Sequence, residues 1–175
     1  MTAHVGWCRL LHMLVTIRIK LLEPFIGDRR TPEQIRRFMR REGDLLLDMA
    51  QWSRAVRQAV VDLHLEDTDP ATILFPLTMP LGRTDMYNRK WWEKRHHEGG
   101  FKNVQKEELC ECIRSGAELS FDVGLAIESQ AADKRPVTLE EFQKIMTYIG
   151  KMIGLSPFGS QFKFGRFTVM SVVPQ

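Results

Sequence analysis

Three stretches of the chain alternate apolar and polar side chains, as strands do when one face of a sheet is buried. They are Leu14–Leu22, Glu118–Glu128 and Phe167–Val173, and the second has the clearest alternation. Two short apolar runs, Leu45–Leu47 and Ile73–Met79, indicate two further strands. We therefore expect a sheet that combines strands from both ends of the chain.

Three other stretches carry helix signals. We predict helices over Thr31–Arg41, Asp48–Leu63 and Thr138–Ile153, because each begins with a residue that caps helix N-termini. The first also has proline at its first helical position, and the third begins with the capping box Thr-x-x-Glu. The second and third show apolar stripes at helical spacing, so we expect both to pack on a core.

The predicted order is strand, helices, strand, long insertion, strand, helix, strand. Two βαβ-type halves on one antiparallel sheet give a ferredoxin-like α+β fold with the helices on one face. We expect a single domain over residues 13–175, preceded by an N-terminal extension at 1–12. Residues 82–106 show no clean period and are interpreted as an inserted basic-aromatic arm or long loop.

The totals are those of an ordinary soluble domain. The chain has 175 residues, 27% of them charged, and a formal net charge of +3. Three cysteines form no disulfide framework, and no segment has the length of a membrane span, which predicts a cytoplasmic protein without a membrane partner. Because the net charge is small, an anionic partner has to be recognised by local clusters of cations.

The first such cluster is rich in arginine, whose planar guanidinium suits phosphate. It comprises Arg29, Arg30, Arg36, Arg37, Arg40 and Arg41. On the predicted helix the last four share one side, and we select Arg36, Arg37 and Arg40 as phosphate contacts. The alternative is a solvated helix face.

The second cluster lies in the insertion, where cations alternate with aromatic rings. Such a mixture suits a single-stranded nucleic acid, whose phosphates bind cations and whose bases stack on rings. The predicted phosphate contacts are Arg89, Lys90, Lys94 and Arg95, and the predicted stacking residues are Tyr87, Trp91 and Trp92. Alternatively, one tryptophan packs on the core, or the arm is a protein interface, where aromatics and arginine are also enriched.

A glycine-rich loop between the last predicted helix and strand is the third candidate. Glycine allows positive φ angles and close approach of a ligand to the backbone. The residues expected to bind nucleic acid here are Gly154, Gly159, Gly165, Lys163 and Arg166. We expect exposed main-chain amides and cations in this loop; the alternative is a simple turn whose phenylalanines belong to the core.

Signals for catalysis are weaker. His96 and His97 could act as acid and base in RNA cleavage, although a histidine pair in a charged loop is more often only solvated. Cys110 and Cys112, expected in a helical turn, lack a second matched pair of zinc ligands, so we predict no metal. No nucleotide-binding or hydrolase motif occurs, and we predict no cofactor.

The C-terminal third of the chain resembles the RAMP superfamily, the CRISPR-associated ferredoxin-like RNA-binding proteins. The resemblance rests on Ile153-Gly154-Leu155 and on Phe164-Gly165-Arg166-Phe167, which opens a strand. The stretch Leu119–Val173 also resembles the ending of phage and prophage proteins. This resemblance implies binding of single-stranded RNA or DNA through the sheet face, the glycine-rich loop and the inserted arm.

The leading hypothesis is therefore a non-enzymatic protein that binds single-stranded nucleic acid, RNA or DNA. The second is a phage or mobile-element protein that uses the same arm for protein–protein assembly, as a homo-oligomer or in a complex. The third is a metal-independent endoribonuclease that uses His96 or His97.

Overall fold

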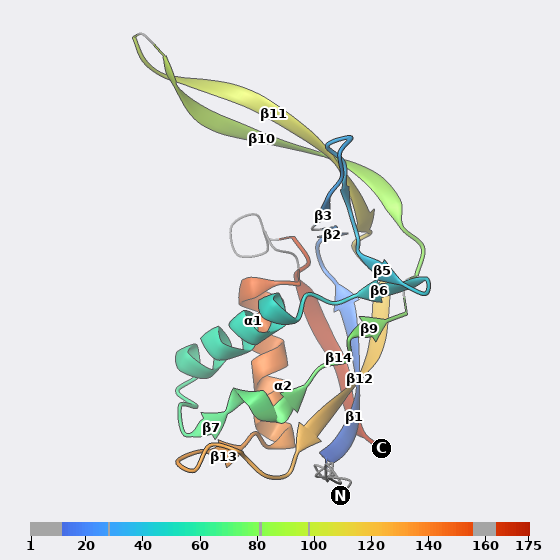
Figure 1. Ribbon diagram of the computed structural model, residues 1–175, viewed down its shortest axis with the longest axis vertical. Helices are drawn as coiled ribbons and strands as arrows, with labels where there is room; N and C mark the ends of the chain where they lie inside the picture. The colour runs from blue at the N-terminus through green and yellow to red at the C-terminus, as the bar shows by residue number, and fades with distance from the viewer. Residues whose placement is uncertain (1–11, 28, 81, 98, 156–163) are drawn as a thin grey trace, which may run out of the picture.

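The structure is a computed structural model of the α+β class, mostly antiparallel sheet with two α-helices. It describes residues 12–27, 29–80, 82–97, 99–155 and 164–175. The main body is a sheet covered on one face by the helices, and a long β-hairpin projects from the end opposite the marked chain termini (Figure 1).

The central sheet has the strand order β14-β1-β12-β8, and every neighbouring pair is antiparallel. Its strands are β1 (His12–Leu21), β8 (Ile73–Leu74), β12 (Glu118–Ala126) and β14 (Phe167–Pro174). The three alternating segments of the sequence are therefore adjacent strands, as predicted. Ile73–Met79 is divided into two short strands rather than one, with β9 (Thr78–Met79) in another sheet.

The helices α1 (Met49–Asp62) and α2 (Leu139–Tyr148) lie on the same side of this sheet (Figure 1). Both begin as the sequence predicts: Asp48 accepts from two backbone amides of α1, and the capping box of α2 is complete. A π-helical turn, η2 (Ile149–Ile153), continues α2, and a short 3-10 helix, η1 (Pro70–Thr72), precedes β8. The helix stripes meet the apolar sheet face in one core.

The alternation of β1 shows how this core forms. Val15, Ile17 and Ile19 are fully buried beneath the helices, while the intervening positions face the other way. The indole of Trp52 on α1 stacks on Phe75 and meets Phe121 of β12 edge to face. The apolar side chains of the strands and of the helices thus pack together in one layer.

The face of the central sheet away from the helices is polar. Thr16 donates to Asp122 at 2.7 Å, and Arg18 forms an ion pair with Glu118 at 2.9 Å. Along the three long strands the open-face positions are occupied mostly by small, aliphatic, polar and charged residues, and the imidazole of His12 is the one ring among these described positions. This face therefore lacks the stacking surface expected of an RNA-recognition sheet.

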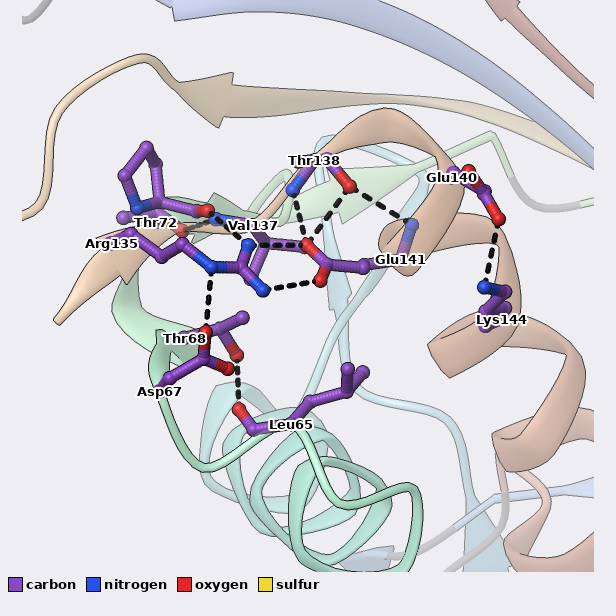
Figure 2. Close-up of polar contacts among 11 residues, drawn as sticks. Leu65, Asp67, Thr68, Thr72, Arg135, Val137, Thr138, Glu140, Glu141 and Lys144 are labelled. Carbon is purple, nitrogen blue, oxygen red and sulfur yellow. Dashed lines mark hydrogen bonds and ion pairs between the residues drawn. The ribbon is translucent and has the colours of Figure 1, made fainter.

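A polar cluster fixes the start of α2 to the preceding loops (Figure 2). The guanidinium of Arg135 donates to Asp67 at 2.7 Å and to both carboxylate oxygens of Glu141. Glu141 also accepts from the backbone amide of Thr138 at 3.0 Å. Two short parallel strands, β7 (Thr68–Asp69) and β13 (Arg135–Pro136), pair beside this cluster.

The insertion is a β-hairpin, not a loop. Its strands begin at residue 85, inside the predicted span of 82–106, and end at residue 113, beyond that span. It consists of β10 (Asp85–His97) and β11 (Gly100–Ile113), paired along their whole length. Near the body, β11 also pairs with β2 (Phe25–Ile26) and β4 (Arg36–Arg37), and β4 pairs with β3 (Arg29–Arg30). The hairpin is therefore rooted in a second sheet.

The predicted first helix is wrong. Its residues form β4, β5 (Arg40–Arg41) and the turns between them, and β5 pairs with β6 (Asp44–Leu46). The cap and proline signals at residues 31 and 32 instead mark the turn between β3 and β4, which the Thr31 amide helps to close by donating to the carbonyl of Ile35. No helix in the described ranges is long and apolar enough to cross a membrane.

Candidate nucleic-acid interface

The register of the hairpin divides its side chains between two faces. Because neighbours in an antiparallel pair share a face, Trp92 and Gln105 lie together, as do Arg89 and Glu108. We call the side that carries Trp92 the front face: Met86, Asn88, Lys90, Trp92, Lys94, His96, Phe101, Asn103, Gln105, Glu107, Leu109 and Glu111. The back face carries Asp85, Tyr87, Arg89, Trp91, Glu93, Arg95, Lys102, Val104, Lys106, Glu108, Cys110 and Cys112.

The front face presents aromatic rings to solvent. Trp92 is 68% exposed and Phe101 is 69% exposed, although both are large apolar side chains. The ammonium of Lys94 lies 5.7 Å from the centre of the Phe101 ring, a cation–π distance. Lys90, also on this face, pairs with Glu107 at 2.9 Å. Exposed rings and cations thus alternate on this face.

The back face is packed near the body. Arg89 is 5% exposed, and its guanidinium lies over the ring of Trp91 at 4.6 Å. Phe164, in the glycine-rich loop, meets Tyr87 edge to face at 6.0 Å. Trp91 is half-buried, so the adjacent tryptophans have different environments, with one packed and one solvated. Further out, Arg95 pairs with Glu93 at 3.1 Å.

A buried carboxylate organises the arginines on the back face. The side chain of Glu108 is only 4% exposed and accepts from Nε of Arg36 at 2.8 Å. Arg30 and Arg89 lie 3.5 and 3.6 Å from the same carboxylate. Burial lowers the pKa of Arg89, and the neighbouring charge of Glu108 opposes that shift. These ion pairs join β3, β4 and β10 to β11.

A second buried carboxylate, Glu111, fixes the segment that follows β4. It accepts from the guanidinium of Arg40, from Oγ1 of Thr84 at 2.8 Å and from the amide of Phe38 at 3.1 Å. Burial would raise the pKa of Glu111, but the hydrogen bonds from Arg40, Thr84 and Phe38 outweigh it and hold the pKa below its usual value. Together, Glu108 and Glu111 lock the base of the hairpin to the body.

Among the selected arginines, Arg36, Arg40 and Arg89 are therefore engaged with buried carboxylates. Arg37 differs: it is exposed and points away from Glu108, since it follows Arg36 in a strand. The sequence analysis singled out neither glutamate. The sequence does contain one signal for these glutamates. Residues 29–41 carry six arginines and few acids, so some of these arginines need an acidic partner from a distant part of the chain.

The described part of the glycine-rich loop is closed by its own backbone. Gly154 has φ of 82°, and a Cβ there would come within 2.5 Å of the carbonyl oxygen of Phe164. The amides of Gly154, Leu155 and Gly165 donate to main-chain carbonyls at 2.7, 2.9 and 2.7 Å. The expectation of exposed amides is therefore wrong at these positions. Gly159 and Lys163 lie outside the described residues.

Arg166 remains a distinct feature of this loop. Its side chain is half-buried, its Nε is shielded from solvent, and Nε has no hydrogen-bond partner among the residues that the structure describes. Its carbonyl accepts from the amide of Leu22 at 2.7 Å, which fixes the backbone at the start of β14. A shielded guanidinium nitrogen of this kind is suited to an additional acceptor.

The cysteine and histidine candidates lie along the hairpin. Cys110 and Cys112 belong to β11, not to a helical turn, and burial raises the pKa of the Cys110 thiol to about 11. His96 is exposed and meets Phe101 edge to face at 5.2 Å, and His97 ends β10. Within the described ranges, no three metal-ligating side chains gather at one point.

Comparison with known proteins gives a likeness in fold. No protein-family model and no curated protein matches the sequence. The structure is similar to a chain in the cryo-EM structure of the type III-B Cmr-β complex bound to cognate target RNA, with a TM-score of 0.59 and 10% sequence identity. The match covers 93% of this chain and 60% of that chain, so this protein spans less than two thirds of its neighbour.

Proposed function

We propose that this chain is a non-enzymatic, RAMP-like domain that binds single-stranded nucleic acid through its hairpin. The central sheet supports a ferredoxin-like assignment, because its order is fourth, first, third and second strand, with helices after the first and third. The likeness to a chain of an RNA-bound Cmr complex supports the RAMP-like relationship and favours RNA over DNA.

The observation that carries this proposal is the exposure of Trp92 and Phe101 on the hairpin's front face. Rings exposed to water add little to the stability of an isolated two-stranded ribbon, and monomeric proteins usually bury such rings. Rings placed beside Lys94 and Lys90 form a surface on which bases stack while cations meet phosphates. The polar open face of the central sheet has no comparable set of rings.

The test is a titration of fluorescently labelled 20-nucleotide oligouridylate and oligothymidylate at salt concentrations from 50 to 300 mM. We expect the logarithm of the affinity to fall linearly with the logarithm of the salt concentration, since bound cations release counterions. Trp92→Ala should weaken binding by about 10-fold, the contribution of one stacked base. Absence of binding by the wild-type protein at 50 mM salt would contradict the proposal.

A protein partner is the second candidate, and one observation favours it. Over residues 85–97 and 100–109, the described strands pair only with each other, which leaves both outer edges of the ribbon open to a further strand. The neighbour in the Cmr structure also belongs to an assembly bound to RNA. Light scattering of nuclease-treated protein distinguishes this candidate: a discrete oligomer that persists at high salt would favour assembly.

A further inference from the structure

The strands β3 and β4 hold two arginines in an electrostatically unfavourable arrangement. Arg29 and Arg37 are directly opposite each other in the antiparallel pair, and both side chains are exposed. Like charges at such positions repel, because their Cβ atoms are only about 5 Å apart. The neighbouring cross-strand pair, Arg30 and Arg36, has the same repulsion but shares the buried carboxylate of Glu108.

No carboxylate of the described residues forms an ion pair with Arg29 or Arg37. Glu33 lies in the intervening turn, and its pKa is lowered chiefly by a hydrogen bond with Thr31 and to a smaller extent by the charge of Arg37. One solvated carboxylate of this kind does not neutralise two guanidinium groups. The pair therefore keeps an excess of positive charge at the base of the hairpin.

The backbone brings the two arginines together by a close approach that requires glycine. A Cβ at Gly27 would come within 2.3 Å of the carbonyl carbon of Arg37. The amide of Gly27 also donates to the carbonyl of Glu111 at 2.8 Å, which ties this segment to β11. The arginine pair is thus part of the folded second sheet, and not a feature of a free loop.

Strand register shows which face of this sheet carries the pair. Arg36 is paired with Cys110 and bonded to Glu108, and both of these belong to the back face. Alternation then places Arg37, and with it Arg29, on the front face. This is the face of Trp92, Lys94 and Phe101. Leu109, which is 40% exposed, and Met86, which is 50% exposed, lie between them at the hairpin base.

We propose that Arg29 and Arg37 form a phosphate site at which the backbone of a single-stranded nucleic acid is held as it leaves the front-face rings. Two neighbouring guanidinium groups that form no ion pair with a carboxylate of the described residues can donate several charge-assisted hydrogen bonds to phosphate oxygens. From Leu109 to Phe101 the ribbon extends on the order of 27 Å, which allows one strand to contact the arginine pair and the rings together. This site rests on the proposed function. It places the bound nucleic acid on the front face of the hairpin.

The experiment compares Arg29→Gln/Arg37→Gln with Arg54→Gln/Arg57→Gln, an equal charge change on the exposed surface of α1. With labelled 20-nucleotide oligouridylate at 0.1 M salt, the first variant should bind about 25-fold more weakly and its salt slope should fall by about 1.4, the value for two phosphate contacts on a single strand. The α1 variant should stay within about threefold of wild type.

Thermal unfolding separates lost contacts from lost structure. Because Arg29→Gln/Arg37→Gln removes a repulsive pair, its Tm should rise by about 1–3 °C while its affinity falls. Equal affinities of the two double variants, with wild-type binding intact, would overturn the phosphate site and leave the proposed function standing. Failure of the wild-type protein to bind at 50 mM salt would instead remove both.

Discussion

Nε of Arg36 lies 2.8 Å from Oε2 of Glu108, although the two residues are 72 positions apart in the chain. Their contact joins β4 to β11 and fixes the base of the hairpin. The carboxylate is almost completely buried and is also approached by Arg30 and Arg89. An acid shared in this way balances charges that would otherwise repel, so its removal leaves buried positive charge without compensation.

Glu108→Gln should therefore destabilise the protein by about 3 kcal/mol, the usual cost of removing one partner of a buried ion pair. Urea unfolding measured by circular dichroism gives this free energy. The matched control is Glu107→Gln, whose side chain is 51% exposed and pairs with Lys90. That change should cost less than about 0.5 kcal/mol. Equal losses in both variants would show that Glu108 has no special structural role.

Replacing Trp52 or Trp92 should change stability by very different amounts. Trp52 is 6% exposed and contacts two other rings, so Trp52→Ala should cost about 3–5 kcal/mol of unfolding free energy. Trp92 is 68% exposed, so Trp92→Ala should change stability by less than about 0.5 kcal/mol. Parallel thermal melts measure the difference. A large loss for Trp92→Ala would mean that its ring supports the fold, and would weaken its assignment to binding.

The cluster in Figure 2 predicts acid sensitivity. Hydrogen bonds from Arg135, with a smaller contribution from Thr138, hold the pKa of Glu141 at about 2, below its usual 4.5. Because the folded-state pKa is lowered, this stabilisation is present above about pH 5 and is lost as the pH falls towards 2. Its size is about 2 kcal/mol after allowance for the solvated side chain of Arg135.

Unfolding free energies measured between pH 7 and pH 2 test this effect. Glu141→Gln should be less stable than wild type at pH 7, and the two curves should converge near pH 2. Glu140→Gln serves as the control, because Glu140 is 79% exposed and pairs with Lys144 one helical turn away. Curves for wild type and Glu141→Gln that stay parallel across this range would refute the assignment.

Gly150→Ala should destabilise the protein although alanine favours helices. A Cβ at this position would lie 2.4 Å from the carbonyl oxygen of Phe167 and 2.8 Å from its ring, and that ring is fully buried. We expect a loss of about 2–3 kcal/mol, as for other overpacked cores. Gly82→Ala, where a Cβ meets nothing within 4 Å, should be nearly neutral. Thermal unfolding of the two variants decides the point.

The parts of the fold that could be predicted from sequence are those whose pattern is local. β1 and β12 each bury one face, and that burial produces the alternation from which they were predicted. In β14, Phe167 is buried, whereas the following residues are half-buried or exposed, and the register with β1 shifts between Arg18 and Ile19. The helix caps at Asp48 and Thr138 are equally local, because the capping side chain bonds to amides within the next turn.

The errors have two physical origins. At residues 31–41 the helix signals compete with Glu108 and Glu111, which bind Arg36 and Arg40 across some seventy residues of sequence, and the tertiary contacts prevail. The hairpin escaped detection as strands because much of its length is solvated on both faces, so its apolar side chains do not alternate. Its mixture of cations and rings was nevertheless visible without the structure.

The pairing of β10 with β11 continues without a shift from Asp85 to His97. Adding or deleting one residue near the middle of β10 would invert every side chain beyond that point, because successive residues of a strand point to opposite sides. The side chains of Trp92 and Lys94 would then point to the back face, and those of Trp91 and Arg95 to the front face. The residue types at the tip would be unchanged. Relatives of this chain that use the same face of the hairpin should therefore vary more readily in residue type along the ribbon than in the number of residues between its root and its tip.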